Sequence, residues 1–255
     1  MTSEERAGAP GEGAVGTPSG ALSTEERVLA ALDAVIDPEL DEPITTLRFV
    51  SSVAASPDGD VDVALRLPTP QCAPNFAFLM AADARDAVRR LPGVRRVTVT
   101  LEDHYTGDEI NGALARGQGF TGAFPGETAD DDLTGLRELF SRKALTARQA
   151  NLCRSLLSTG ATAEQVVAMT VAELPDGPEA RRCVALRAQL GIDARPRAPA
   201  FVLPDGEPLS AAALPRWLRM ASLIATSLET NGGICRDLLA VRHGLEQGHR
   251  RSDGA

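Results

Sequence analysis

Cys72 lies at a position where a thiol could react with electrophiles or bind a metal. Cys72 lies in "LRLPTPQCAPNFAFLM", residues 65–80, between an alternating apolar segment and a helix-like pattern that follows Pro74. Unpaired amides and the helix dipole at a helix start favour a negative charge, so they would stabilise the thiolate. A thiolate attacks electrophiles and binds metals. Thr69 could offer it a hydroxyl. The alternative is that Cys72 is simply a small buried apolar side chain.

The remaining candidate ligands are scattered along the chain. Cys153, Cys183 and Cys235 form no C-x-x-C pair, which argues against a structural zinc site and a disulfide framework. Each falls on or beside an apolar stripe, so a core position is the alternative to convergence with Cys72. His104 follows a predicted strand and could partner the thiol, or it could be an exposed loop imidazole.

Two short patterns near the C-terminus could also bind ligands. Glu246 and His249 have the carboxylate-histidine spacing of di-iron bundles, but such sites need two copies of that motif, so chance is the alternative. Asn231-Gly232-Gly233 would expose backbone amides before a helix and could hold an anion, or it could be a plain helix break.

Composition excludes several classes of function. The chain has 255 residues, 43% of them hydrophobic, and a net charge of −9 without a basic cluster, which argues against a nucleic-acid partner. No apolar run approaches the ~18 residues of a membrane span. Residues 1–22 lack the features of a secretion signal and are typical of a disordered tail. We therefore expect a cytoplasmic protein with reduced thiols.

The segment 23–103 must position Cys72. Ser23 with Glu26 matches a capping box, and the apolar face that follows predicts a helix ending at Asp37. Residues 49–67 predict a β-hairpin, 74–91 a helix and 95–103 a third strand. This order predicts a small α+β domain, with one sheet covered by two helices.

The rest of the chain has a different pattern. The Gly-rich segment 104–130 is typical of a linker. Residues 131–250 predict a mostly helical domain, with one helix near 133–140, another opened by Thr146 and Gln149, a third started by Thr162 and Gln165, and a long run after Ser210 that breaks at 231–233.

Residues 24–102 resemble a known family. The shared marks are Asp37-Pro38-Glu39 after the first helix, Thr69-Pro70 with Cys72 after the second strand, and Leu91-Pro92-Gly93-Val94 before the third. In these marks the segment is similar to the iron-sulfur cluster assembly domain of SufT-like proteins and of the phenylacetate-pathway D protein.

The resemblance implies a non-enzymatic role in maturing iron-sulfur or related iron proteins. Cys72 would be the reactive thiol, a cluster contact and a metal ligand, with Asp37, Glu39 and Thr69 in supporting roles. Iron or an iron-sulfur cluster would be held only transiently. The alternative for Asp37 is that its carboxylate merely caps a turn.

The chain departs from the family pattern at two places. The usual Asp-Leu-Gly after the acidic motif is replaced by Thr46-Leu47-Arg48, so a large residue stands where the family has glycine. The proline that commonly follows the cysteine is displaced to Pro74 by Ala73. Both changes could alter the geometry of the loop.

We therefore expect an accessory factor whose helical domain recognises a client. The expected partner is a client metalloprotein, such as an iron-dependent oxygenase, or the assembly machinery; a homodimer is an open alternative. The rival hypothesis is a metal-free adaptor for protein–protein contacts. A thiol enzyme would need a base and oxyanion donors, and the sequence shows neither beside Cys72.

Overall fold

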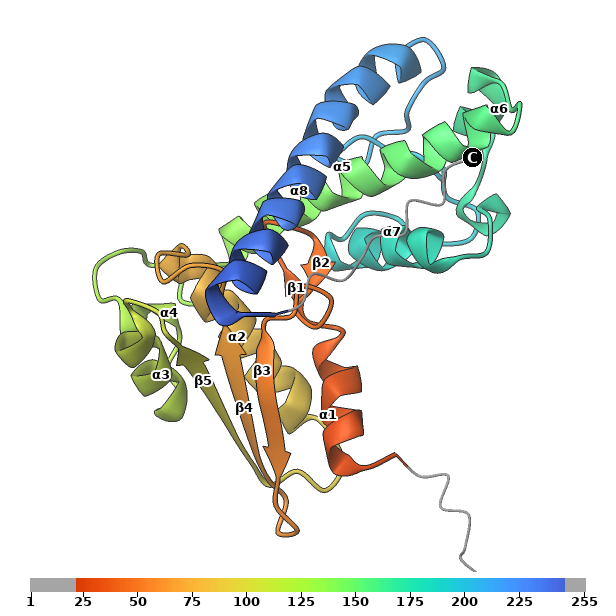
Figure 1. The fold of residues 1–255 in the computed structure, drawn as a ribbon. Coiled ribbons are helices and arrows are strands. Elements are labelled where there is room, and N and C mark those ends of the chain that lie inside the picture. Colours follow the sequence, from red (N-terminus) through yellow and green to blue (C-terminus); the bar gives the residue numbers. More distant parts are fainter. Residues whose placement is uncertain (1–21, 246–255) are drawn as a thin grey trace, which may run out of the picture.

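The computed structural model describes residues 22–245 and confirms the predicted α+β fold (Figure 1). The tail expected over 1–22, apart from Leu22, and the Glu246/His249 pattern lie outside the described residues. The first part contains α1 (Thr24–Leu32), β1 (Ile36–Asp37), β2 (Glu42–Pro43), β3 (Val50–Ala55), β4 (Asp60–Arg66), α2 (Pro74–Arg89), β5 (Arg96–Glu102), α3 (Gly107–Ala115) and α4 (Phe120–Ala123). The second contains α5 (Thr134–Ser158), α6 (Ala163–Ala168), the 3₁₀ turn η1 (Val171–Glu173), α7 (Pro178–Gln189) and α8 (Leu214–His243).

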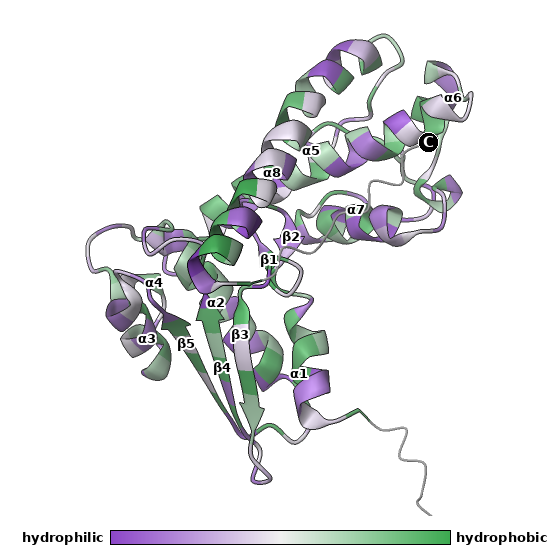
Figure 2. Ribbon diagram, viewed as in Figure 1, coloured by the Kyte–Doolittle hydropathy of each residue, from purple (hydrophilic) through white to green (hydrophobic). Residues whose placement is uncertain are grey.

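A three-stranded mixed sheet organises the first part. Its order is β3-β4-β5: β4 pairs antiparallel with β3 and parallel with β5, placing Val63 beside Val53 and Val99. The alternation predicted for β4 is confirmed, since Val61, Val63 and Leu65 are buried and Asp62 is exposed. Figure 2 shows the apolar residues running along the strands. Helix α2 carries the crossover from β4 to β5 and contacts α1 and β5.

The predicted hairpin depends on one glycine. Gly59 has φ +86, a conformation that side chains other than glycine rarely adopt, and a Cβ there would collide with the carbonyl oxygen of Gly93. The Arg95 amide donates to the Gly59 carbonyl at 2.8 Å. The hairpin turn therefore also fixes the turn between α2 and β5.

The first helix is confirmed, but it ends earlier than predicted. Ser23 and Glu26 form the expected capping box, while α1 ends at Leu32 and not at Asp37. Residues 36–43 instead form the two-stranded ribbon β1-β2, in which Asp37 pairs with Glu42. The ribbon carries the acidic motif.

The prediction of a linker over 104–130 is wrong for residues 107–123. These residues form α3 and α4, whose apolar side chains Ile110, Ala113, Leu114, Phe120 and Ala123 are buried in the first core. The side chain of Asn111 accepts from the Leu101 amide at 2.8 Å and donates to the Leu101 carbonyl at 3.1 Å. Asn111 thus satisfies the backbone of β5 where no further strand pairs with it.

Two breaks predicted in the helical region do not occur. Residues 134–158 form one 25-residue helix, in which the Thr146 hydroxyl donates to the carbonyl of Arg142 at 2.9 Å instead of capping. Gln149 reaches sideways, where its amide exchanges hydrogen bonds of 2.8 and 3.1 Å with the backbone of Val202. Helix α8 likewise continues through Asn231-Gly232-Gly233, so those amides lie within a helix and the suggested anion site is wrong.

The second core lies among α5, α6, α7 and the start of α8. Its most deeply buried members include Leu145, Cys153, Val166, Phe201 and Leu214. The capping box predicted at Thr162 and Gln165 is confirmed. No helix among residues 22–245 is long and apolar enough to cross a membrane.

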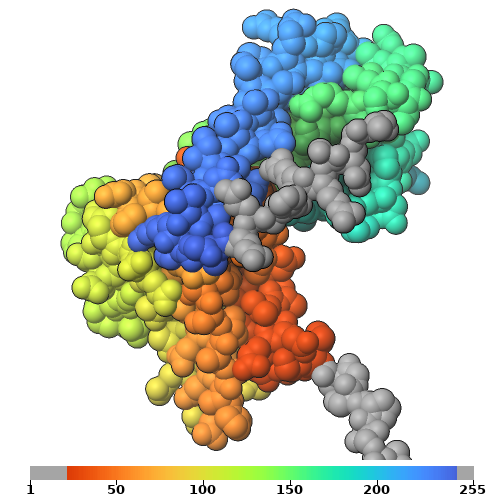
Figure 3. All heavy atoms as spheres, viewed as in Figure 1, coloured from red at the N-terminus to blue at the C-terminus, as the bar shows by residue number. Residues whose placement is uncertain are grey.

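The two parts are joined by side chains from both long helices. From α5, Arg137 forms a bidentate ion pair with Asp83 at 2.6 and 2.8 Å, and Arg148 pairs with Asp41 at 2.6 Å. At its C-terminal end, α8 lies over the first part, as Figure 3 shows. There Leu239 is buried in the first core. The helical region is therefore packed against the first domain at both places.

Candidate functional site: the Cys72 loop

Cys72 lies in the loop between β4 and α2. It is half-buried and packs against the first core. Helix α2 begins two residues later with Pro74 at its first position, where a missing amide hydrogen costs nothing, and with Ala73 as an N-cap without a side-chain bond. The predicted position of the thiol just before a helix start is therefore confirmed, despite the displaced proline.

Thr69 contacts the thiol directly. Its Oγ1 lies 3.7 Å from Cys72 Sγ, and the Cys72 amide donates to the Thr69 carbonyl at 3.4 Å. The loop therefore forms a tight turn that places a hydroxyl beside the sulfur. The hydroxyl that Thr69 was expected to offer therefore lies at contact distance from the sulfur, and its supporting role stays a prediction.

His104 binds the loop through its backbone. Its Nδ1 accepts from the Thr106 amide at 3.3 Å, so in the neutral ring Nε2 carries the proton and donates to the Cys72 carbonyl at 2.8 Å. The Tyr105 amide donates to the Pro70 carbonyl at 3.1 Å. The imidazole is thus neither a partner of the sulfur nor a free loop group. It holds the Cys72 backbone to the end of β5.

Asp37 is a buried turn cap. One carboxylate oxygen accepts from the amides of Glu39 and Leu40 at 2.8 and 2.9 Å, as the turn-capping alternative predicted. Only 6% of the residue is exposed, and this burial, with smaller contributions from Glu39 and Glu42, outweighs the two amides and raises its pKa to about 6. Asp37 therefore holds Glu39 in place.

The four cysteines do not converge. Cys153 and Cys183 are buried in the second core, and burial raises the pKa of each to about 12. Cys235, on α8, packs against the first core as Cys72 does. Between residues 22 and 245, no group of three or more His, Cys, Asp or Glu side chains could hold a metal ion.

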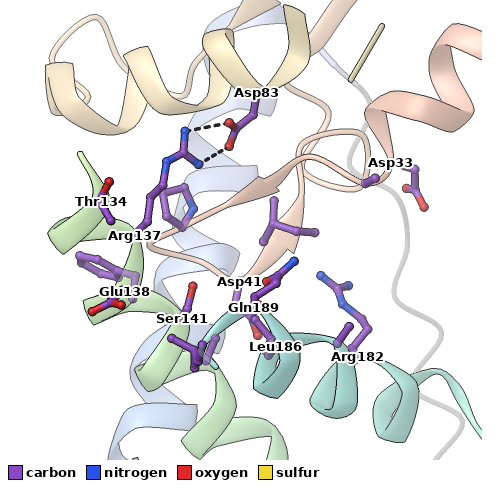
Figure 4. A pocket seen from close by; sticks show the side chains of 17 residues that line it. Asp33, Asp41, Asp83, Thr134, Arg137, Glu138, Ser141, Arg182, Leu186 and Gln189 are labelled. Atoms are coloured by element: carbon purple, nitrogen blue, oxygen red, sulfur yellow. Dashed lines mark hydrogen bonds and ion pairs between the residues drawn. The ribbon is translucent and has the colours of Figure 1, made fainter. Parts of the chain in front are cut away.

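A separate cleft of about 740 Å³ lies between the two parts of the molecule (Figure 4). It is bounded by the residues before β2, by α5 and by α7, and the Asp83–Arg137 ion pair crosses one end. Arg182 also lines the cleft, and burial lowers its pKa. Cys72, His104 and Asp37 are not among the lining residues. Sequence patterns missed this cleft because its walls come from segments far apart in the chain.

The first part is thus a small α+β domain with an acidic turn after α1 and a cysteine, held through its backbone carbonyl, just before α2. Residues 25–101 match the family described as iron-sulfur cluster assembly protein, and the chain belongs to that family. The rest of the chain has no family assignment.

Three relatives illustrate the similarity. An uncharacterized protein of Methanocaldococcus jannaschii is 36% identical over 93 residues, covering 36% of this chain and 96% of that protein. An iron-sulfur cluster carrier protein of Mycobacterium tuberculosis is 40% identical over 87 residues, which span 34% of this chain but only 22% of the carrier. The crystal structure of a domain of unknown function from Bacillus anthracis is 23% identical, with a TM-score of 0.30, over 36% of this chain and 92% of that domain.

Proposed function

We propose that this protein is a non-enzymatic accessory factor that handles iron or an iron-sulfur cluster during maturation of a client metalloprotein in the cytoplasm. The observation that supports this most is the Cys72 loop. In a chain of the cluster-assembly family, it presents a half-exposed thiol next to a hydroxyl, on a backbone fixed by His104 and Tyr105. A fixed loop places the sulfur without ordering cost when iron or a partner arrives.

The direct test is anaerobic purification of the full chain with analysis of iron and acid-labile sulfide. Wild type should carry or accept iron, and Cys72→Ser should lose it while keeping its circular dichroism and melting temperature. Cys153→Ala, in the second core, is the matched control and should keep the iron. A Cys72→Ser chain that retains full iron loading would refute the role of this thiol.

Client recognition is the proposed task of the helical region. Large apolar side chains on α8 are exposed at Ile234, Leu238 and Val241, spaced to form one face of the helix. Exposed apolar surface of this kind is a typical contact for a protein partner. An iron-dependent oxygenase is one class of client that the family resemblance suggests.

Charged substitutions on that face separate recognition from iron handling. The double variant Leu238→Glu/Val241→Glu should lose capture of a metalloprotein from native lysate but keep its iron. Leu29→Glu, at an exposed apolar position on α1, should leave capture unchanged. If the client captured by wild type is fully metallated in a strain lacking this protein, the metal-free adaptor is the correct function.

A further inference from the structure

The last turn of α8 binds the backbone where the Cys72 loop begins. Arg242 donates from Nη1 to the Leu67 carbonyl at 3.2 Å and from Nη2 to the Asp103 carbonyl at 3.0 Å. Leu67 follows β4 at the start of the loop, and Asp103 follows β5. One guanidinium therefore bridges the ends of two neighbouring strands. Its hydrogen bonds are charge-assisted and for that reason stronger than those between neutral groups.

The end of β5 also carries the side chain that holds the loop. His104 directly follows Asp103, and its Nε2 donates to the Cys72 carbonyl at 2.8 Å. Arg242 binds the carbonyl of the peptide that joins Asp103 to His104. The path from Arg242 to the Cys72 backbone thus consists of two hydrogen bonds joined through that peptide and the His104 side chain.

The backbone of Asp103 explains why this turn needs support. Its φ of +52 lies in the left-handed region, which residues other than glycine adopt infrequently. Arg242 binds the carbonyl of Asp103 and also its carboxylate, with 3.4 Å between Nη2 and Oδ2. The arginine therefore stabilises the turn that leads into His104.

An alternative role for Arg242 is to complement the negative end of the helix dipole, as basic residues in a last turn do. His243 is in the same last turn and meets that requirement as well. A dipole interaction does not require a guanidinium to bind two carbonyls at the ends of β4 and β5. The contacts of Arg242 thus indicate a task beyond the helix itself.

From these contacts we infer that Arg242 is a positioning residue for the Cys72 thiol. It acts on the loop directly at Leu67, and through Asp103 it acts on His104. The inference deepens the proposed function and rests on it, because a loop held in place presents the thiol to iron or a partner without a cost of ordering. The helical region, which has no family assignment, would thereby complete the site of the family domain.

The test compares Arg242→Met with Arg236→Met in the full chain. Arg236 lies on the same helix, and its ion pair with Glu42 also joins α8 to the first part. The two arginine side chains are similarly buried, with 24% of Arg236 and 25% of Arg242 exposed. Both variants weaken the attachment of α8, but only Arg242→Met frees the carbonyls of Leu67 and Asp103. The comparison therefore separates positioning of the loop from attachment of the helix.

Two rates report on the loop. Hydrogen exchange of peptides containing residues 67–73 and 103–106 measures how often these segments open. Arg242→Met should exchange them at least ~5-fold faster than wild type, because two charge-assisted hydrogen bonds are lost. Iodoacetamide should alkylate Cys72 faster in the same variant, since the half-buried thiol is then uncovered more often. Arg236→Met should keep both rates close to those of wild type.

Arg242→Lys tests for rescue. Lysine keeps a charged donor but not the planar fork that spans two carbonyls, so both rates should fall between those of wild type and Arg242→Met. If circular dichroism shows that Arg242→Met does not fold, Arg242→Lys replaces it, with Arg236→Lys as the control. Wild-type rates in the Arg242 variant would overturn the inference, and so would an equal increase in the Arg236 variant.

Neither rate depends on iron, so this inference and the proposed function can fail separately. Full iron loading of Cys72→Ser, with faster loop exchange in Arg242→Met, would remove the iron role and leave Arg242 as the residue that positions the loop. Iron loading that requires Cys72, with wild-type rates in Arg242→Met, would leave the accessory function and remove the role of Arg242.

Discussion

At the residue scale, Asp37 combines a structural task with an energetic cost. Its carboxylate fixes the turn through the amides of Glu39 and Leu40, yet it is buried enough for its pKa to rise to about 6. A carboxyl group whose pKa is higher in the folded state than in the unfolded state binds more protons when folded. Its contribution to stability is therefore complete at low pH and is lost as pH rises.

The corresponding prediction concerns Asp37→Asn. Between about pH 4 and about pH 6, the free energy of unfolding of wild type should fall relative to that of the variant by up to ~3 kcal/mol. Asparagine keeps an oxygen that can accept from both amides but does not ionise. Urea unfolding of both proteins across this pH range gives the difference directly. A difference that does not change with pH would show that Asp37 is not responsible.

Arg48 replaces the glycine of the Asp-Leu-Gly pattern in the family that residues 24–102 resemble. Its φ of +64 is in the left-handed region, which explains the family preference and shows that the chain keeps the turn without the glycine. Arg48→Gly should be more stable than Arg48→Ala by ~1 kcal/mol, because both variants remove the same side-chain interactions and only one relieves the backbone. Thermal unfolding of the pair checks this. Equal stability of the two variants would show that the left-handed backbone at residue 48 is not strained.

At this scale the sequence located the residues but not all of their contacts. Thr69 and Cys72 were found because prolines and a helix start lie close to them in the chain, whereas Asp37 was found through the resemblance of Asp37-Pro38-Glu39 to the family motif. The contact of His104 was missed because it is made through the backbone of Cys72, which no side-chain pattern reveals. Cys235 was assigned to an apolar stripe, and nothing near it in the sequence indicates which surface that stripe meets.

At the scale of elements, local signals predicted helix starts better than helix ends. The hairpin and the capping boxes at Ser23 and Thr162 are confirmed. The breaks in α5 and α8 are absent, because residues with weak helix propensity are tolerated when neighbouring segments pack on them. Gln149, part of a predicted helix start, binds Val202, and Gly232, part of a predicted break, lies against Glu42, so both residues make tertiary contacts instead.

The adjacent glycines of α8 test this explanation. Gly233 has no atom within 4 Å of the position of an added Cβ, so Gly233→Ala should stabilise the protein by ~1 kcal/mol through helix propensity. At Gly232 the added carbon would lie 2.7 Å from Glu42 Oε1, whose carboxylate pairs with Arg236. Gly232→Ala should therefore give less stability than Gly233→Ala. Thermal unfolding of both variants measures this difference. A higher melting temperature for Gly232→Ala than for Gly233→Ala would contradict the explanation.

At the scale of the whole molecule, one of the links between the two parts is a buried ion pair. The side chains of Arg148 and Asp41 are 9% and 10% exposed, and burial raises the pKa of Asp41 although Arg148 opposes this. Arg148→Met would leave the buried carboxylate unpaired and should cost ~3–5 kcal/mol. Arg154→Met, on an exposed position of the same helix, should cost less than ~0.5 kcal/mol.

Urea unfolding measures both effects. Adding Asp41→Asn to Arg148→Met should recover part of the loss, since the unpaired charge is then removed. If Arg148→Met were no more destabilising than Arg154→Met, the ion pair between Arg148 and Asp41 would contribute nothing to the contact between the two parts.

The minimal folding unit extends beyond the segment matched by the family. A fragment of residues 22–103 lacks Ile110, Leu114 and Phe120, which are buried in the first core. We expect a fragment of residues 22–133 to unfold cooperatively at a higher urea concentration than 22–103, because it keeps that apolar burial. Equal midpoints would show that α3 and α4 are dispensable for this core.

The position of α8 at the end of the described chain has a consequence for synthesis on the ribosome. Domains fold in order as the chain emerges, so the sheet and the Cys72 loop are made long before Arg242, which binds the carbonyls of Leu67 and Asp103. A chain that stops before α8 contains the whole family segment but lacks this arginine. Translation must therefore pass α8 before Arg242 can bind these two carbonyls.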